Sequence, residues 1–236
     1  MIIDGTDKQY KLIVMYEASK TRKLLKEDEI SLLNGKGIDI GCGEDPVTTD
    51  CERFDVADGD ANKITGHIKE LNSYDYVFSA HCLEHMYIPK DTIQDWWKLV
   101  KPGGVLIVIV PDEDLYEQGY WPSLFNPDHK ATFTIGKQTS WCPTSHNLLD
   151  LANLLPEGEL VNARLQDHLY DRKFISHKNW SAKAALKFSA FRFNYYTQNK
   201  WYKSLFEKIL HLLRVPIDQT LGPASAQNLL IVQKAK

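Results

Sequence analysis

The chain has 236 residues, of which 43% are hydrophobic and 25% charged, and its formal net charge at pH 7 is −3. This length permits one sizeable hydrophobic core, so we expect a single domain over residues 1–236. No apolar run approaches the roughly 18 residues that a membrane-spanning helix needs, which argues against an integral membrane protein.

The charges are unevenly distributed along the chain. Residues 1–171 carry 16 Lys and Arg against 29 Asp and Glu, whereas residues 172–214 carry ten basic residues and one acid. The cysteines form no CxxC pair, and no basic stretch followed by an apolar segment precedes them, so we expect reduced thiols in a cytoplasmic protein. They are Cys42, Cys51, Cys82 and Cys142.

The first elements are a helix and two short strands. Apolar residues among many charges predict a helix over 17–33 that Asn34-Gly35 would end, which makes residues 1–34 a helical lead-in. Apolar runs predict buried strands at 37–40 and 52–56. Only about ten residues separate these strands, and a parallel crossover needs roughly a dozen, so any helix between them would be a stub beginning at Pro46.

The middle of the chain alternates strand, helix and strand. Residues 74–80 read as a strand covered on both faces. Asp91 and Gln94 resemble a capping box that begins the next helix. Residues 101–104, Lys-Pro-Gly-Gly, would end this helix and lead into the strongly β-prone run 105–110. This alternation favours a parallel α/β sheet.

The pattern loosens after Pro111. Residues 112–141 form an aromatic, proline-punctuated segment too long for a simple connector, and loops of that length often carry function. A helix near 147–155 and a strand near 160–165 are expected next, and 228–232 reads as the last strand. Between the last two of these strands, the basic and aromatic segment 172–214 is interpreted as a helical insertion that packs over a ligand pocket as a cap.

The residues that follow the predicted strands favour a nucleoside ligand. Open parallel sheets bind ligands beyond the carboxyl ends of their strands. There, Gly41 and Gly43 would let a ligand approach the backbone closely. Asp55 is placed to accept hydrogen bonds from ribose hydroxyls, and Asp60-Ala61 could pair a carboxylate and a backbone N–H with an adenine edge.

The motifs that are missing narrow the choice of nucleoside. The loop lacks the Lys-Ser or Lys-Thr of a P-loop and the third glycine of a dinucleotide site. Asp39, Glu44 and Asp45 crowd negative charge around it, which suits a ligand with an ammonium and a sulfonium better than one with phosphates.

As a set, these motifs resemble the class I S-adenosylmethionine-dependent methyltransferases over about residues 35–111. The resemblance rests on residues 39–43 (DIGCG), 75–85 (DYVFSAHCLEH) and 99–104 (LVKPGG), with Asp55 and Asp60-Ala61. It implies a Rossmann-like α/β sheet, mostly parallel with an antiparallel last strand, and S-adenosylmethionine as cofactor. It also implies the cofactor-binding residues: Asp39, Gly41, Cys42, Gly43, Ala80 and His81 at the methionine moiety, Asp55 (with Asp50 as the fallback) at the ribose, and Asp60 and Ala61 at adenine.

Methyl transfer from a sulfonium is an in-line displacement, so the enzyme mainly aligns the acceptor and excludes water. An oxygen acceptor also benefits from a base, typically by about 10²–10⁴-fold. The candidates are His81, His85 and His129, and we favour His129 because it lies in the long loop expected to cover the acceptor. Asp and His also cluster near residues 112–129, but this stretch has no HxxxH or similar ligand spacing, so no metal is expected there.

The sequence therefore predicts methyl transfer from S-adenosylmethionine to a small-molecule or glycan acceptor, with oxygen as the favoured methyl-accepting atom. A nonenzymatic nucleoside-binding regulatory module and a methyltransferase acting on RNA are the alternatives. The basic segment 172–214 would meet the protein core, an anionic or lipid-linked acceptor at a membrane surface, or RNA. The acidic main body disfavours nucleic acid.

Overall fold

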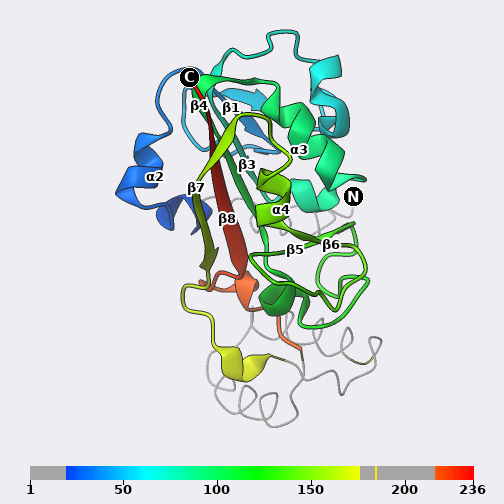
Figure 1. The fold of residues 1–236 in the computed structure, drawn as a ribbon. Helices are drawn as coiled ribbons and strands as arrows, with labels where there is room; N and C mark the ends of the chain where they lie inside the picture. Colours follow the sequence, from blue (N-terminus) through cyan, green and yellow to red (C-terminus); the bar gives the residue numbers. More distant parts are fainter. Residues whose placement is uncertain (1–19, 176–183, 185–215) are drawn as a thin grey trace, which may run out of the picture.

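The computed structural model describes residues 20–175, 184 and 216–236. At its centre is a six-stranded sheet in the order β2-β1-β3-β4-β8-β7 (Figure 1). The first part of the predicted lead-in, residues 1–19, and nearly all of the predicted insertion over 172–214 lie outside the described residues. Of that insertion, Arg172–Phe174 forms a single 3-10 turn, η4.

The first four strands of the sheet are parallel, as the sequence predicts. They are β1 (Gly37–Ile40), β2 (Glu52–Phe54), β3 (Tyr74–Ala80) and β4 (Val100–Pro111). All four residues of β1 are buried, because apolar clusters cover both faces of the sheet.

The last two strands run against their neighbours. β8 (Gln227–Lys234) is antiparallel to β4, and β7 (Gly158–Gln166) is antiparallel to β8. The prediction of a mostly parallel sheet with an antiparallel last strand is confirmed. β8 lies inside the sheet although it comes last in the chain, which explains why residues 227–232 are all buried.

Strand β4 begins earlier than predicted, because the Lys-Pro-Gly-Gly turn is part of it. The pairing of β3 with β4 shifts register between Tyr74 and Tyr76. Gly104 lies where backbones meet: a Cβ there would be 2.8 Å from the carbonyl oxygen of Tyr74 and 2.9 Å from that of Asp75. Only glycine fits such an approach.

Helices cover both faces of the sheet (Figure 1). α3 (Pro89–Trp97) joins the larger apolar cluster through Ile93 and Trp96. On the other face, Leu25, next to α2 (Glu27–Ser31), packs with the inner side chains of β3 and β4. Short elements complete the fold: η1 (Ala61–Gly66), η2 (Leu83–His85), η3 (Glu113–Glu117), β5 (Thr132–Thr134), β6 (Ser145–Asn147), α4 (Leu148–Ala152) and η5 (Gln219–Leu221).

One predicted helix start is wrong, and the stub helix that the sequence allowed at Pro46 is absent from the described residues. α3 begins at Pro89 rather than at Asp91, because proline at the first helical position already has the required φ. No helix forms from Pro46 in the described segment 41–51. There the backbone groups of a first turn are used elsewhere: the N–H of Val47 donates to Asp39, and the carbonyl of Pro46 accepts from Arg22.

The predicted helix over 17–33 is also interrupted, at residues 24–26, within the part that the structure describes. α2 starts afresh there, because the carboxylate of Glu29 accepts the backbone N–H of Lys26 at 2.8 Å. Glu29 also binds Arg164 of β7, which ties the interrupted lead-in to the edge of the sheet.

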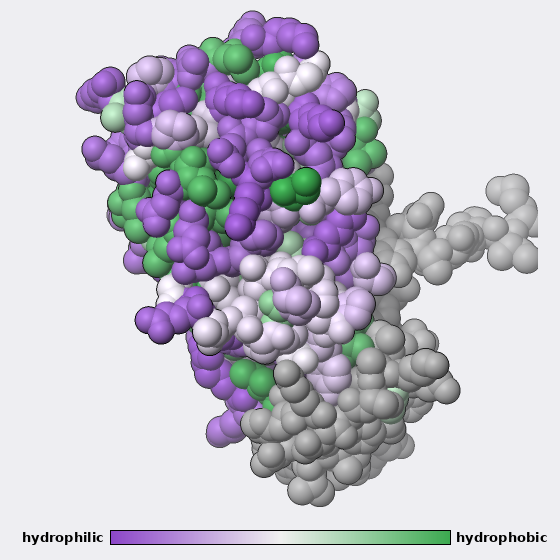
Figure 2. All heavy atoms as spheres, turned by 45° about the vertical axis from the view of Figure 1, so that its right-hand side comes forward, coloured by the Kyte–Doolittle hydropathy of each residue, from purple (hydrophilic) through white to green (hydrophobic). Residues whose placement is uncertain are grey.

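The surface is mostly hydrophilic on the face shown in Figure 2, with apolar residues in smaller groups. Within the described ranges, none of the helices has both the length and the apolar character to cross a membrane.

Candidate functional site

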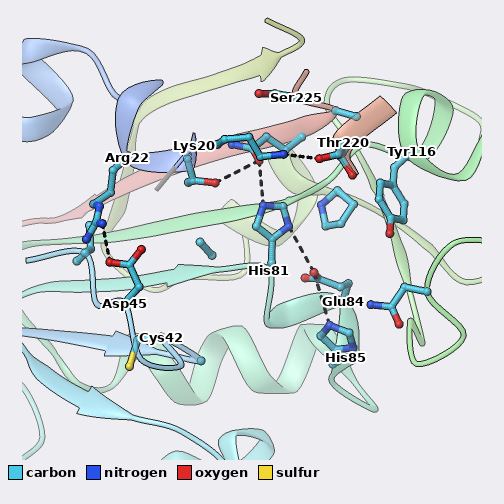
Figure 3. Close-up of a pocket in the computed structure, with 18 of the residues that line it drawn as sticks. Lys20, Arg22, Cys42, Asp45, His81, Glu84, His85, Tyr116, Thr220 and Ser225 are labelled. Atoms are coloured by element: carbon cyan, nitrogen blue, oxygen red, sulfur yellow. Dashed lines mark hydrogen bonds and ion pairs between the residues drawn. The ribbon is translucent and has the colours of Figure 1, made fainter. Parts of the chain in front are cut away.

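A cavity of about 220 Å³ opens at the carboxyl ends of β1 and β3. This is the edge at which a parallel sheet presents its ligand site. Five segments far apart in the sequence contribute to its lining: residues 20–22, the loop after β1, the residues that follow β3, those that follow β4, and the stretch just before β8 (Figure 3).

The loop after β1 turns sharply at its first glycine. Gly41 has a φ of +79°, and a Cβ there would lie 2.6 Å from the Cβ of Cys82. Its N–H donates to the carbonyl of Phe54 in β2 at 2.8 Å. The glycine therefore lets the chain pass between two strand ends while its Cα faces the cavity.

The second glycine of the loop is held by the acid after β2. The N–H of Gly43 donates to Oδ2 of Asp55 at 2.6 Å, and the N–H of Val56 donates to Oδ1 of the same carboxylate at 2.7 Å. The structure thus joins two residues that the sequence predicts for the cofactor site. Neither Gly43 nor Asp55 lines the cavity.

Asp39, the last acid of β1, is buried at the floor of the cavity with 3% exposure. Its Oδ2 accepts the N–H of Val47 at 2.7 Å. Burial raises the pKa of this carboxyl to about 7, although the Val47 hydrogen bond and the charge of Arg22 oppose the shift. A cation that enters the cavity would therefore favour the ionised carboxylate.

The negative charge of the loop is smaller than the sequence suggests. Arg22 contacts Oδ1 of Asp45 at 2.5 Å and the carbonyl of Pro46 at 2.6 Å (Figure 3). Lys20, also at the cavity, donates to the carbonyl of Gly222 at 3.1 Å. Sequence reasoning missed both basic residues, because nothing in the lead-in indicates that it returns to the strand ends.

The residues predicted for adenine lie outside the cavity lining. Oδ1 of Asp60 accepts from the backbone N–H of Asn62 at 2.9 Å and from its side chain at 2.8 Å, so Asp60 caps η1. The carbonyl of Ala61 accepts from the indole N–H of Trp96 at 2.8 Å. Their role at the cofactor stays a prediction, as does that of the fallback residue Asp50, which is exposed.

The end of β3 brings predicted residues into the cavity. Ala80 and His81 line it together with Asp39, Gly41 and Cys42. His81 has a φ of +55°, which is uncommon for a residue with a side chain. Its Nε2 lies 2.9 Å from Oε1 of Gln227.

Two further histidines meet at the opposite part of the cavity. The carbonyl of Glu84 in η2 accepts the N–H groups of Lys130 at 2.8 Å and Ala131 at 3.2 Å, which docks the long loop onto η2. The ring centroids of His85 and His129 consequently lie 5.1 Å apart, and both residues line the cavity. The structure therefore brings all three predicted catalytic histidines to one cavity.

Carboxylates surround these histidines. Nδ1 of His129 donates to Oε1 of Glu117 at 2.8 Å, and Nδ1 of His85 lies 3.0 Å from Oδ2 of Asp128. Oε1 of Glu84 lies 3.7 Å from Nδ1 of His81 and 3.8 Å from Nε2 of His85 (Figure 3). Sequence reasoning did not anticipate Glu117, because its partner lies in another part of the loop.

Glu84 is almost completely buried, at 1% exposure. Burial alone raises its pKa, but the nearby His81 ring and the charges of the three histidines outweigh burial and lower it. Among the described residues, Oε2 of Glu84 and Oε2 of Glu117 are buried without a hydrogen-bond partner.

Comparison with known proteins assigns the chain to a family. A family model described as a methyltransferase domain matches residues 15–148, more than half of the chain. The match confirms the resemblance to class I methyltransferases and, with it, S-adenosylmethionine as the cofactor. No protein of curated function matches the sequence significantly.

Solved structures give weaker likenesses. A SAM-dependent methyltransferase from Archaeoglobus fulgidus is 14% identical, with a TM-score of 0.46 over 92% of this chain and 94% of that one. Phosphoethanolamine N-methyltransferase 2 from Haemonchus contortus, in complex with S-adenosyl-L-methionine, is 12% identical, with a TM-score of 0.44 over 87% of this chain and 51% of that one. Likenesses this weak say nothing of the acceptor.

Proposed function

The chain belongs to the methyltransferase-domain family, and we propose that it transfers the methyl group of S-adenosylmethionine to an oxygen of a small-molecule or glycan acceptor. The observation that carries the proposal is a single cavity that joins the Asp39–Gly41 loop to the buried pair His129 and Glu117. One part of this cavity suits the cofactor and the other suits an acceptor hydroxyl.

The cofactor would lie against the ends of β1 and β3. Its amino-acid end carries an ammonium and a carboxylate, and the cavity offers Asp39 for the first and the cations Lys20 and Arg22 for the second. Gly41 gives the ligand access to the backbone, and the chain after β3 at Ala80 and His81 closes the other side. Gly43, Asp55, Asp60 and Ala61 would complete the site only if the loop and η1 rearrange around the nucleoside.

The acceptor would lie against the histidines and the long loop. Tyr116 and Asn126 line this part of the cavity beside His85 and His129. Such a mixture of rings and amide groups suits a polar, hydroxylated molecule. An anionic or lipid-linked acceptor remains part of the proposal, since the basic segment predicted to meet it lies outside the described residues.

His129 is placed to promote attack by an oxygen. Its Nδ1 is fixed by Glu117 at 2.8 Å, so its Nε2 is the nitrogen left for other partners. A ring nitrogen held in this way can accept the proton of a hydroxyl, an effect of about 10²–10⁴-fold on rate. The hydroxyl oxygen would then attack the methyl carbon, and the carbon–sulfur bond would break with its electron pair on sulfur.

The test separates binding from turnover. Calorimetry would measure the affinity of the full chain for S-adenosylmethionine and for its demethylated product, and radiolabelled cofactor would report methyl transfer to polar extracts, purified glycans and RNA. His129→Gln should lose at least about 100-fold in turnover while its cofactor affinity changes less than twofold. The exposed His168, which does not line the cavity, provides the matched control His168→Gln.

Each alternative has its own result. Tight cofactor binding with no methylation of any extract would favour a nonenzymatic regulatory module. Transfer to RNA alone would favour the RNA-acting alternative, and near-normal turnover in His129→Gln would remove this histidine from the reaction.

A further inference from the structure

We propose that Glu84, His85 and His129 form a binding site for a divalent transition-metal ion at the acceptor side of the cavity. One carboxylate oxygen and one ring nitrogen from each histidine lie within 4.8 Å of one another. The sequence gives no sign of this group, because η2 and the long loop supply its members from positions more than 40 residues apart.

The donor set suits ions such as Zn²⁺ and Co²⁺. Imidazole nitrogens and a carboxylate oxygen are usual ligands of these ions, whereas Mg²⁺ prefers oxygen alone. Bonds of about 2.1 Å in tetrahedral geometry place ligand atoms roughly 3.4 Å apart. Oε1 of Glu84 and Nε2 of His85 are already 3.8 Å apart, and all three ligand atoms lie within 4.8 Å, so side-chain rotations that move these atoms by about 1–1.5 Å would complete the set.

Each histidine is oriented by a carboxylate at its other ring nitrogen. Nδ1 of His129 donates to Glu117 at 2.8 Å, and Nδ1 of His85 lies 3.0 Å from Asp128. Nε2 of both rings is thereby left for an ion. This arrangement of carboxylate, histidine and metal is the one by which proteins fix the tautomer and direction of a metal-binding ring.

The acid of the cluster supplies an independent observation. Glu84 is 1% exposed, and its Oε2 has no hydrogen-bond partner among the described residues. A buried carboxylate oxygen without a partner is unfavourable, and the bond to a cation would remove that penalty.

The position of the site suggests its use, and this step alone rests on the proposed function. His85 and His129 line the cavity that also contains Gly41, so a bound ion would face the acceptor and hold its hydroxyl oxygen. With the ion bound, the hydroxyl would become more acidic, its proton would pass to solvent, and His129 would act as a ligand; the role of His129 as a base applies to the ion-free chain.

Direct metal binding tests the site. The full chain, stripped with a chelator and dialysed, would be titrated with Zn²⁺ by calorimetry and with Co²⁺ by visible absorption. We expect one ion per chain, and we expect visible absorption bands from bound Co²⁺ that persist when Mg²⁺ is added. Glu84→Gln and His129→Ala should bind at least about 100-fold more weakly, and Glu117→Gln about 10–100-fold more weakly.

Two controls keep the result interpretable. His168→Ala, at an exposed histidine outside the cavity, should bind as the unaltered chain does. Thermal melting in chelator identifies variants that fail to fold, and His85→Asn, at a partly exposed position, provides a second ligand change if Glu84→Gln unfolds.

The outcomes separate this inference from the proposed function. Less than about a tenth of an ion per chain, or equal affinity in Glu84→Gln and the His168→Ala control, overturns the metal site. Methyl transfer that persists in chelator with no ion bound would support the proposed function and reject the use of the ion at the acceptor. One bound ion in a chain that does not bind S-adenosylmethionine would support the site and reject the proposed function.

Discussion

Asp39→Asn should change how the stability of the ligand-free chain depends on pH. The folded-state pKa of Asp39 is about 7 against an ordinary value of 3.8, because the carboxyl is buried with 3% exposure. A raised pKa means that the folded chain binds the proton more tightly than the unfolded chain. The stabilisation is therefore complete below about pH 4 and is lost as the pH rises to about 7.

The size of the effect follows from the shift. About three pKa units, at 1.36 kcal/mol each, correspond to about 4 kcal/mol lost between pH 4 and pH 8. Asparagine cannot ionise, and its Oδ1 can still accept the N–H of Val47. The free energy of unfolding of Asp39→Asn minus that of the unaltered chain should therefore be about 4 kcal/mol more favourable to the variant at pH 8 than at pH 4.

Urea unfolding of both chains at several pH values measures this difference, and the comparison cancels the titration of groups common to both. In calorimetry, the substitution should also weaken S-adenosylmethionine binding at pH 8, because the ligand ammonium loses its carboxylate. A stability difference that stays constant from pH 4 to pH 8 would refute the reasoning about Asp39.

Three further substitutions test local features by chemical unfolding. Gly41→Ala should lower the free energy of unfolding by about 1–2 kcal/mol from its φ of +79° alone. It should also weaken cofactor binding, because the new methyl group would meet Cys82 at 2.6 Å. Unchanged cofactor affinity would contradict the contact assigned to Gly41. Gly104→Ala should cost at least about 1–3 kcal/mol, since its Cβ would meet backbone oxygens at 2.8–3.0 Å, and a neutral effect would show that β3 and β4 separate easily. Trp96→Phe should cost about 1–3 kcal/mol, because it leaves the carbonyl of Ala61 without its 2.8 Å donor; a smaller loss would mean that water replaces the indole.

Local patterns were enough to predict the centre of the fold. Residues 74–80 and 105–110 are apolar and β-prone, so their strands and parallel pairing could be read from the sequence. The helix starts were harder because competing local signals existed. Pro89 begins α3 in place of the Asp91 capping box, and tertiary hydrogen bonds to Val47 and Pro46 replace the expected helical turn.

The candidate site was predictable only in its glycine loop and strand ends. Gly41 and Asp39 line the cavity, as expected from their place at the carboxyl end of β1. The pairing of Arg22 with Asp45 and of His129 with Glu117 depends on how the loops fold and pack, which no spacing in the sequence records. The Glu84–His85–His129 cluster was missed for the same reason, since metal-ligand spacing was sought along the chain rather than across it.

A crystal structure of the full chain with the demethylated cofactor would test the central claim most directly. We predict that the ligand occupies the cavity at the ends of β1 and β3, with its ammonium at Asp39, its backbone contact at Gly41 and its sulfur facing the side of the cavity that holds His129. An empty cavity in the presence of saturating ligand, or a ligand bound elsewhere on the chain, would contradict the account.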